Sequence, residues 1–180
     1  MRTVALVTVI VALASLSCAG HARVQTSTTN TKWPKEALET LTPDELAQFI
    51  KALPAFSGAL KAAKWSNPNT KEVDDQLGTL SRMVESMNVP GINDSLRPYG
   101  GWTKVRPTLY KVFAATAAVF VGRQSPQFIE GLKQDTTERG RHTLKNFEFF
   151  KTVCAQIPES NKQLVAQHQN DLQPLGSLGN

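Results

Sequence analysis

The residues best suited to bind a ligand or a partner lie close together between positions 97 and 106. Aromatic and basic side chains are interleaved there: Arg97, Tyr99, Trp102, Lys104 and Arg106. Aromatic rings beside guanidinium groups suit flat or anionic ligands, because they combine stacking with paired hydrogen bonds. The same residue types anchor protein interfaces. The segment is therefore predicted to bind a partner, and the alternative is that the rings cover the core beneath the arginine side chains.

Groups that could perform catalysis are sparse in this sequence. Glu138 and His142 stand four residues apart, a spacing that favours a contact on one face of a helix. Asp74 and Asp75 are adjacent, so a helix would turn them to different sides. The sequence contains no nucleophile-elbow, zinc-protease, phosphate-loop or dinucleotide-binding motif. We therefore predict no catalytic residue, no metal site and no cofactor.

The sequence has two cysteines, which are too few for a disulfide scaffold. Cys154 lies in an aromatic and apolar stretch, residues 147–157. A reactive thiol needs an accessible and basic setting. The apolar surroundings of Cys154 instead favour a buried, inert side chain.

The first 22 residues have the pattern of a secretory signal peptide. Arg2 is their sole charged residue, an apolar run covers residues 4–16, and small residues follow at 17–20. The run is shorter than the roughly 20 apolar residues that span a bilayer. Cleavage near 22/23 would release the chain, and cleavage near 17/18 would leave Cys18 for lipidation. A buried N-terminal helix or an uncleaved anchor is the alternative.

Residues 23–34 are polar, rich in threonine and without an apolar period, which is typical of a flexible tether. We therefore expect an exported protein that is periplasmic, lipid-anchored or extracellular. Contact with a membrane is expected only through a lipid on Cys18. A nucleic-acid partner is not expected, because the chain is exported and carries no nucleic-acid-binding motif.

The remaining chain, residues 35–173, is predicted to form one all-α domain, a compact bundle of five to six helices. Its clearest helix start combines Thr42, Pro43 and Glu45 in a capping box. Pro54 is expected to break that helix. Further apolar stripes recur at helical spacing, and no alternating strand pattern occurs. The most apolar helix is expected at 107–121, further helices from 126, from 138 and over 158–172, and a frayed tail at 174–180.

Residues 88–107 are predicted to be the longest internal loop. Pro90, Pro98, Pro107 and several glycines interrupt regular structure there. Long loops in compact domains are often functional. This is a second reason to place the partner site between 97 and 106.

The chain of 180 residues has 41% apolar residues and a formal net charge of +5, a composition typical of a globular protein. The charge is unevenly distributed. Residues 36–94 hold nine acids and five bases, whereas residues 97–151 hold ten bases and four acids. The basic half favours an anionic partner. The alternative is that the two halves neutralise each other in the fold.

Together these features predict an exported, non-enzymatic helical protein that binds a protein or an anionic envelope component through residues 97–106. One alternative is a carrier of a small apolar ligand, with a cavity lined by the helix at 107–121, Phe147 and Phe150. A second alternative is an enzyme whose site follows no familiar motif.

Overall fold

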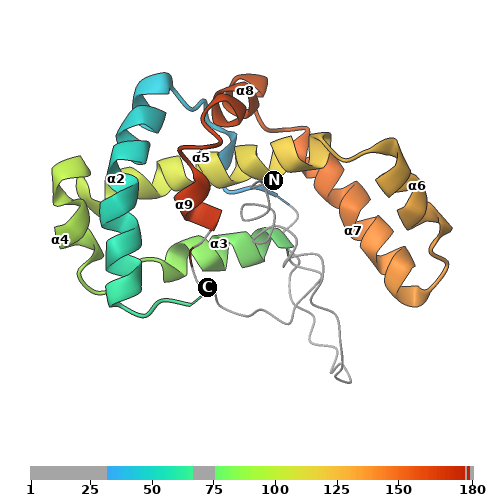
Figure 1. The fold of residues 1–180 in the computed structure, drawn as a ribbon, viewed down its shortest axis with the longest axis horizontal. Coiled ribbons are helices and arrows are strands. Elements are labelled where there is room, and N and C mark those ends of the chain that lie inside the picture. Colours follow the sequence, from blue (N-terminus) through green and yellow to red (C-terminus); the bar gives the residue numbers. More distant parts are fainter. Residues whose placement is uncertain (1–31, 67–75, 177, 179–180) are drawn as a thin grey trace.

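The computed structural model describes residues 32–66, 76–176 and 178, and every regular element in these ranges is a helix (Figure 1). The all-α prediction is confirmed for this part of the chain. The predicted signal segment, Cys18, residues 23–31 of the tether, Asp74 and Asp75 lie outside the described residues. The helices, with 3-10 helices labelled η, are η1 (Lys35–Leu38), α2 (Pro43–Ala62), α3 (Gln76–Ser86), α4 (Ile92–Leu96), η2 (Arg97–Tyr99), α5 (Gly101–Gly122), α6 (Pro126–Gln134), α7 (Glu138–Cys154), α8 (Glu159–Gln167) and α9 (Gln173–Gly176).

The described residues form eight α-helices, where the sequence predicted five to six. Two of the eight are only five and four residues long, α4 and α9. Helices of that length cannot show a helical period of apolar residues, and for this reason the pattern did not reveal them.

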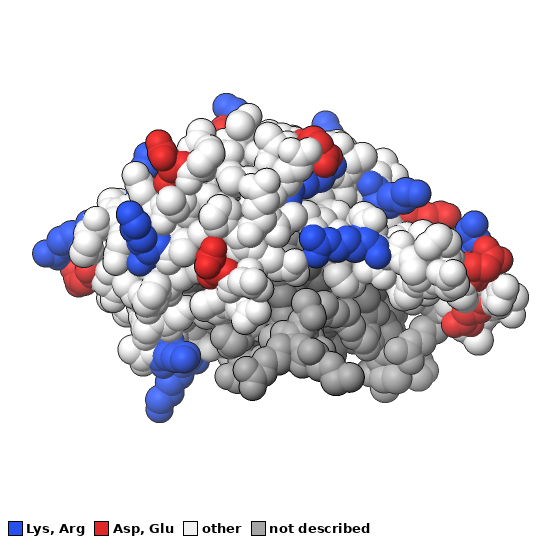
Figure 2. All heavy atoms as spheres, turned by 45° about the horizontal axis from the view of Figure 1, so that its top comes forward, with Lys and Arg blue, Asp and Glu red and all other residues white. Residues whose placement is uncertain are grey.

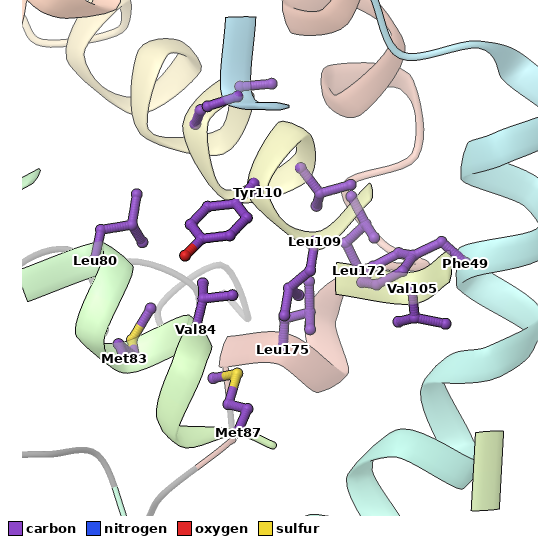
Figure 3. Close-up of a cluster of buried hydrophobic side chains, with 14 of the residues drawn as sticks. Phe49, Leu80, Met83, Val84, Met87, Val105, Leu109, Tyr110, Leu172 and Leu175 are labelled. Atoms are coloured by element: carbon purple, nitrogen blue, oxygen red, sulfur yellow. The ribbon is translucent and has the colours of Figure 1, made fainter. Parts of the chain in front are cut away.

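Helix α5 forms the centre of the fold, as predicted for the apolar stretch at 107–121. It packs against η1, α2, α4, α7 and α8 and crosses most of the molecule (Figure 1). Figure 3 shows part of the core, where side chains from α2, α3 and the C-terminal segment meet Leu109 and Tyr110 of α5. A helix that is apolar on nearly all faces is stable only when neighbours cover it, and these elements bury most of α5 between Thr108 and Ala118, whereas Thr103 and Lys104 near its start are exposed.

Helix α2 begins at the predicted capping box but continues through Pro54. Thr42 Oγ1 accepts a hydrogen bond from Glu45 N at 3.2 Å, and Glu45 Oε2 accepts one from Thr42 N at 2.9 Å. Pro54 removes one helical hydrogen bond, at a cost of about 3 kcal/mol. Leu53 and Phe56 beside it are buried, and each contributes about 1.5–3 kcal/mol. Burial therefore outweighs the break that was predicted at Pro54.

The prediction of one long loop over residues 88–107 is wrong, because α4, η2 and the first turns of α5 occupy most of it. Trp102 N donates to Asn93 Oδ1 at 2.9 Å and so satisfies a backbone group at the start of α5. Pro107 lies inside α5. Three glycines with positive φ join the short helices: Gly91 (81°), Gly100 (89°) and Gly101 (75°).

Both ends of the described chain pack into the fold. Trp33 falls in the predicted tether but is buried, and its Nε1 donates to Val153 O at 2.8 Å. Leu175 and Leu178 fall in the tail that was predicted to fray, and both are also buried. Each end carries a large apolar side chain whose burial holds the neighbouring backbone in place.

Candidate functional site

The residues predicted as the partner site differ in their environments. Arg97 has a side chain that is 80% exposed and forms an ion pair with Asp94. Lys104 is exposed on α5. Trp102 is buried and stacks on Phe56, with ring centroids 6.2 Å apart and an angle of 14° between the rings. Trp102 therefore belongs to the core, which agrees with the alternative interpretation of the aromatic residues.

The other two predicted residues also face the protein. Tyr99 is half-buried against the core. Arg106 Nε lies 2.7 Å from Glu85 Oε1, and its Nη2 lies 3.5 Å from Glu36 Oε1. The Arg106 guanidinium also lies 5.5 Å from the centroid of the Tyr110 ring. The charge of Arg106 on α5 is therefore paired with acidic side chains of α3 and η1.

Tyr110 completes this inter-helix cluster. Its hydroxyl donates to Glu85 Oε1 at 2.9 Å. Burial, followed by the hydrogen bond to Glu85, raises the pKa of Tyr110 to about 12, so the phenol stays protonated at neutral pH. The hydrogen bond to Glu85 likewise raises the pKa of Arg106. The spacing of Arg106 and Tyr110 along α5 was visible in the sequence, whereas their acidic partner comes from another helix.

A second polar cluster surrounds Lys111, which is buried on α5. Its Nζ donates to Glu45 Oε1 at 3.0 Å and to Thr40 O at 3.1 Å. Burial alone would raise the pKa of Glu45, but the hydrogen bonds from Thr42 N and Lys111 and the charge of Lys111 lower it overall. A buried ammonium that is bonded in this way holds α5 to the start of α2 and is not a candidate nucleophile.

These clusters bear on the uneven charge of the sequence. Arg106 and Lys111 come from the basic half, and their partners Glu36, Glu85 and Glu45 come from the acidic half. On the face seen in Figure 2, basic and acidic side chains are interspersed. The charges of these two bases are therefore neutralised by acids from the other half of the chain.

The candidate catalytic pair lies on a helix surface. Glu138 is exposed in the first turn of α7, and His142 Nδ1 lies 3.2 Å from Asn146 Nδ2 on the same helix. His168 Nδ1 lies 3.0 Å from Asp171. Across the part of the chain that the structure describes, no three histidine, cysteine or acidic residues come together as a metal site would require.

The thiol of Cys154 is buried, as predicted. Burial raises its pKa to about 12, against a small opposite effect of the Lys162 charge. A thiol with that pKa is almost fully protonated at neutral pH and is a poor nucleophile.

Helices α6 and α7 form a helical hairpin at the C-terminal end of α5 (Figure 1), and among the described residues the most exposed large apolar side chain, Phe128, lies on α6. Ser125 caps α6 by accepting from Phe128 N at 3.1 Å, and Thr137 caps α7 by accepting from Gly140 N at 3.0 Å. The helices meet where the rings of Phe128 and Phe147 lie edge to face, with centroids 5.9 Å apart. Phe128 nevertheless remains 45% exposed.

We call five apolar side chains on this hairpin the hairpin face: Phe128, Ile129, Leu132, Leu144 and Phe147. None of them is buried, and α6 has no buried residue at all. None belongs to the core cluster or to the half-buried side chains packed against it. The sequence showed these residues as stripes on two helices but could not show that Phe128 stays exposed and that the other four are only partly covered.

No described helix is both long enough and apolar enough to cross a membrane. Comparisons with protein families, curated proteins and solved structures found no match to this chain.

Proposed function

We propose that this is an exported, non-enzymatic helical protein that binds a protein component of the cell envelope through the hairpin face. The hairpin face is the single observation that carries the binding surface, and the signal-peptide pattern of the first 22 residues supports export. A contiguous patch of apolar side chains that the fold leaves partly exposed is a common mark of a protein-binding surface, whereas single exposed apolar residues are not.

The residue types of the hairpin face suit a protein partner. Phe128 and Phe147 offer aromatic rings, which contribute a large share of the energy at protein interfaces. Complete burial of one such side chain contributes about 1.5–3 kcal/mol relative to full exposure. Phe128 is 45% exposed and the other four residues are partly exposed, so a partner that covers them gains part of this energy.

The spacing of the hairpin face favours a helical partner. Phe128 and Leu132 are four residues apart on α6, and Leu144 and Phe147 are three apart on α7. Side chains at these spacings form ridges and grooves into which another helix can pack.

A second contact is supported by the exposed basic residues of the originally predicted site. Arg97 and Lys104 keep exposed side chains. They are the members of that set that an anionic envelope component could reach without disturbing the core.

Photo-cross-linking tests the role of the hairpin face. Benzoylphenylalanine in place of Phe128 is expected to give a defined protein adduct in native envelope. The same group in place of Thr103, which is exposed on α5, serves as the control and is expected to give none. The proposal fails if position 128 gives no more adduct than position 103.

A further inference from the structure

We propose that Asn93 on α4 is the acceptor of an N-linked oligosaccharide. Asn93, Asp94 and Ser95 form an Asn-x-Ser sequon, the acceptor sequence for this modification, and no other asparagine of the chain lies in such a sequon. This inference rests on the export part of the proposed function, because oligosaccharide is transferred to chains that enter the secretory pathway.

The surface position of the sequon fits a large attached group. Asn93 and Asp94 are exposed and Ser95 is half-buried. The residues on either side, Ile92 and Leu96, are the ones that α4 buries. The helix therefore turns its apolar side to the core and Asn93 to the solvent. An oligosaccharide is bulky and hydrated, so an asparagine in this position carries it without displacing the core.

One hydrogen bond fixes which atom of the Asn93 amide faces the protein. Trp102 N lies 2.9 Å from this amide. A backbone N–H only donates, so the atom that it contacts is the acceptor, Oδ1. The atom to which an oligosaccharide is attached, Nδ2, is on the other side of the amide, and it makes no hydrogen bond to another described residue. Attachment at Nδ2 therefore breaks no contact of the described fold.

The chemistry of the transfer preserves the bond to Trp102. The donor class is an oligosaccharide on a polyprenyl diphosphate. Nδ2 attacks C1 of its first sugar, a C–N bond forms, and the bond from C1 to the diphosphate oxygen breaks. The polyprenyl diphosphate leaves with that electron pair, and Nδ2 gives one proton to a base of the transferase. The product is still an amide with a free Oδ1, so it still accepts from Trp102 N at the start of α5.

The location of the sequon leaves the hairpin face accessible. Helix α4 lies at the opposite end of the molecule from α6 (Figure 1). Arg97, by contrast, is four residues from Asn93 and is also exposed. An oligosaccharide on Asn93 therefore shields the second contact at Arg97 and Lys104 more than it shields the hairpin face.

Expression in a eukaryotic secretory cell line, with the chain's own first 22 residues, tests the inference. Treatment with peptide N-glycosidase is expected to increase the electrophoretic mobility of the wild-type protein. Mass spectrometry of untreated protein is expected to find the oligosaccharide on the peptide that contains Asn93. Asn170 is the internal control, because it is exposed and is also followed by aspartate, but Leu172 stands in place of the serine. Its peptide is expected to be unmodified.

Two variants of Ser95 separate the sequon from the fold. The Ser95 hydroxyl makes no hydrogen bond to another described residue, and Ser95→Ala leaves Asn93 and its bond to Trp102 in place. This variant is expected to lose the mobility shift entirely. Ser95→Thr keeps an acceptor sequence and is expected to retain the shift. Helical circular dichroism and a melting temperature near that of wild type verify that both variants are folded.

A version in which the leader of a known secreted protein replaces residues 1–22 separates this inference from the proposed function. Oligosaccharide is measured in the medium and in the cell extract. Modification with the replacement leader alone supports the inference and counts against export by the chain's own leader. Secretion with an unmodified Asn93, no modification with either leader, or a shift that persists in Ser95→Ala overturns the inference. An unmodified Asn93 in the native protein also overturns it.

Discussion

Asn161 of α8 binds the backbone of Leu41, although 120 residues separate them in the chain. Its Oδ1 accepts from Leu41 N at 2.8 Å, and its Nδ2 donates to Glu39 O at 2.8 Å. Asn161 is completely buried. One side chain thus satisfies a donor and an acceptor of the backbone between η1 and α2, and it fixes that segment against α8.

Asn161→Ala is expected to lower the free energy of unfolding by about 2–4 kcal/mol, because it leaves the Leu41 N–H and the Glu39 carbonyl without this partner. Urea unfolding measures the change. Asn170→Ala alters an exposed asparagine and is the control, with an expected change within about 0.5 kcal/mol. Equal losses in both variants would contradict the role assigned to Asn161.

The ion pair between Lys111 and Glu45 makes stability depend on pH. The folded-state pKa of Glu45 lies below its ordinary value of 4.5. Its contribution to stability is therefore complete above that ordinary value and is lost as the pH falls through the lowered pKa. Glu45→Gln is expected to cost about 1–3 kcal/mol at pH 7 and to flatten the decline in stability between about pH 5 and 3. Unfolding measured across that range tests both effects, and an unchanged acid profile in the variant would count against them.

Cys154 is expected to react with a thiol reagent only after the protein opens. In the chain without residues 1–22 it is the sole cysteine. Its pKa of about 12 and its burial should keep labelling at pH 8 far slower in the native protein than in guanidinium chloride. Labelling rates in both conditions test this, and native labelling as fast as in denaturant would refute the buried position.

Arg106 and Arg97 are expected to differ in their effect on stability. Arg106→Ala removes a hydrogen bond to Glu85 and a contact with the Tyr110 ring, and should cost about 1–2 kcal/mol. Arg97→Ala removes an exposed ion pair and should change stability by less than about 0.5 kcal/mol. Denaturant unfolding of the two variants makes the comparison. A larger loss of stability in Arg97→Ala than in Arg106→Ala would show that Arg106 is not held in the cluster described above.

The second contact has its own test. Replacement of both Arg97 and Lys104 by alanine is expected to weaken binding to anionic lipid vesicles and to leave the melting temperature near that of wild type, because both side chains are exposed. Vesicle flotation measures the binding. Equal flotation of wild type and double variant would remove these residues from the list of candidate contacts.

Features that depend on neighbouring residues could be predicted from the sequence. The capping box of Thr42 and Glu45 involves residues three apart, and the cap of α6 at Ser125 likewise acts on Phe128. The apolar character of α5 also placed it in the core. In each case the signal and its structural effect lie within a few turns of one helix.

Features that depend on distant residues could not be predicted in this way. Lys111 is 66 residues from Glu45, and no local pattern pairs them. The glycines that join α4, η2 and α5 adopt left-handed backbone, so a single residue is enough to turn the chain. The segment that was expected to be a loop can therefore consist mostly of helices. The apolar stripes of the hairpin face predicted helices correctly. They do not show which of these side chains remain partly exposed in the fold.

The attachment of Trp33 to α7 has a mechanical consequence. Its indole donates to the carbonyl of Val153, and its ring lies edge to face with that of Phe150, with centroids 6.5 Å apart. A pulling force applied to the chain ahead of residue 33 would therefore load the C-terminal end of α7 first. If the N-terminal end is fixed to an envelope, Trp33 is the first described core residue that the tension reaches.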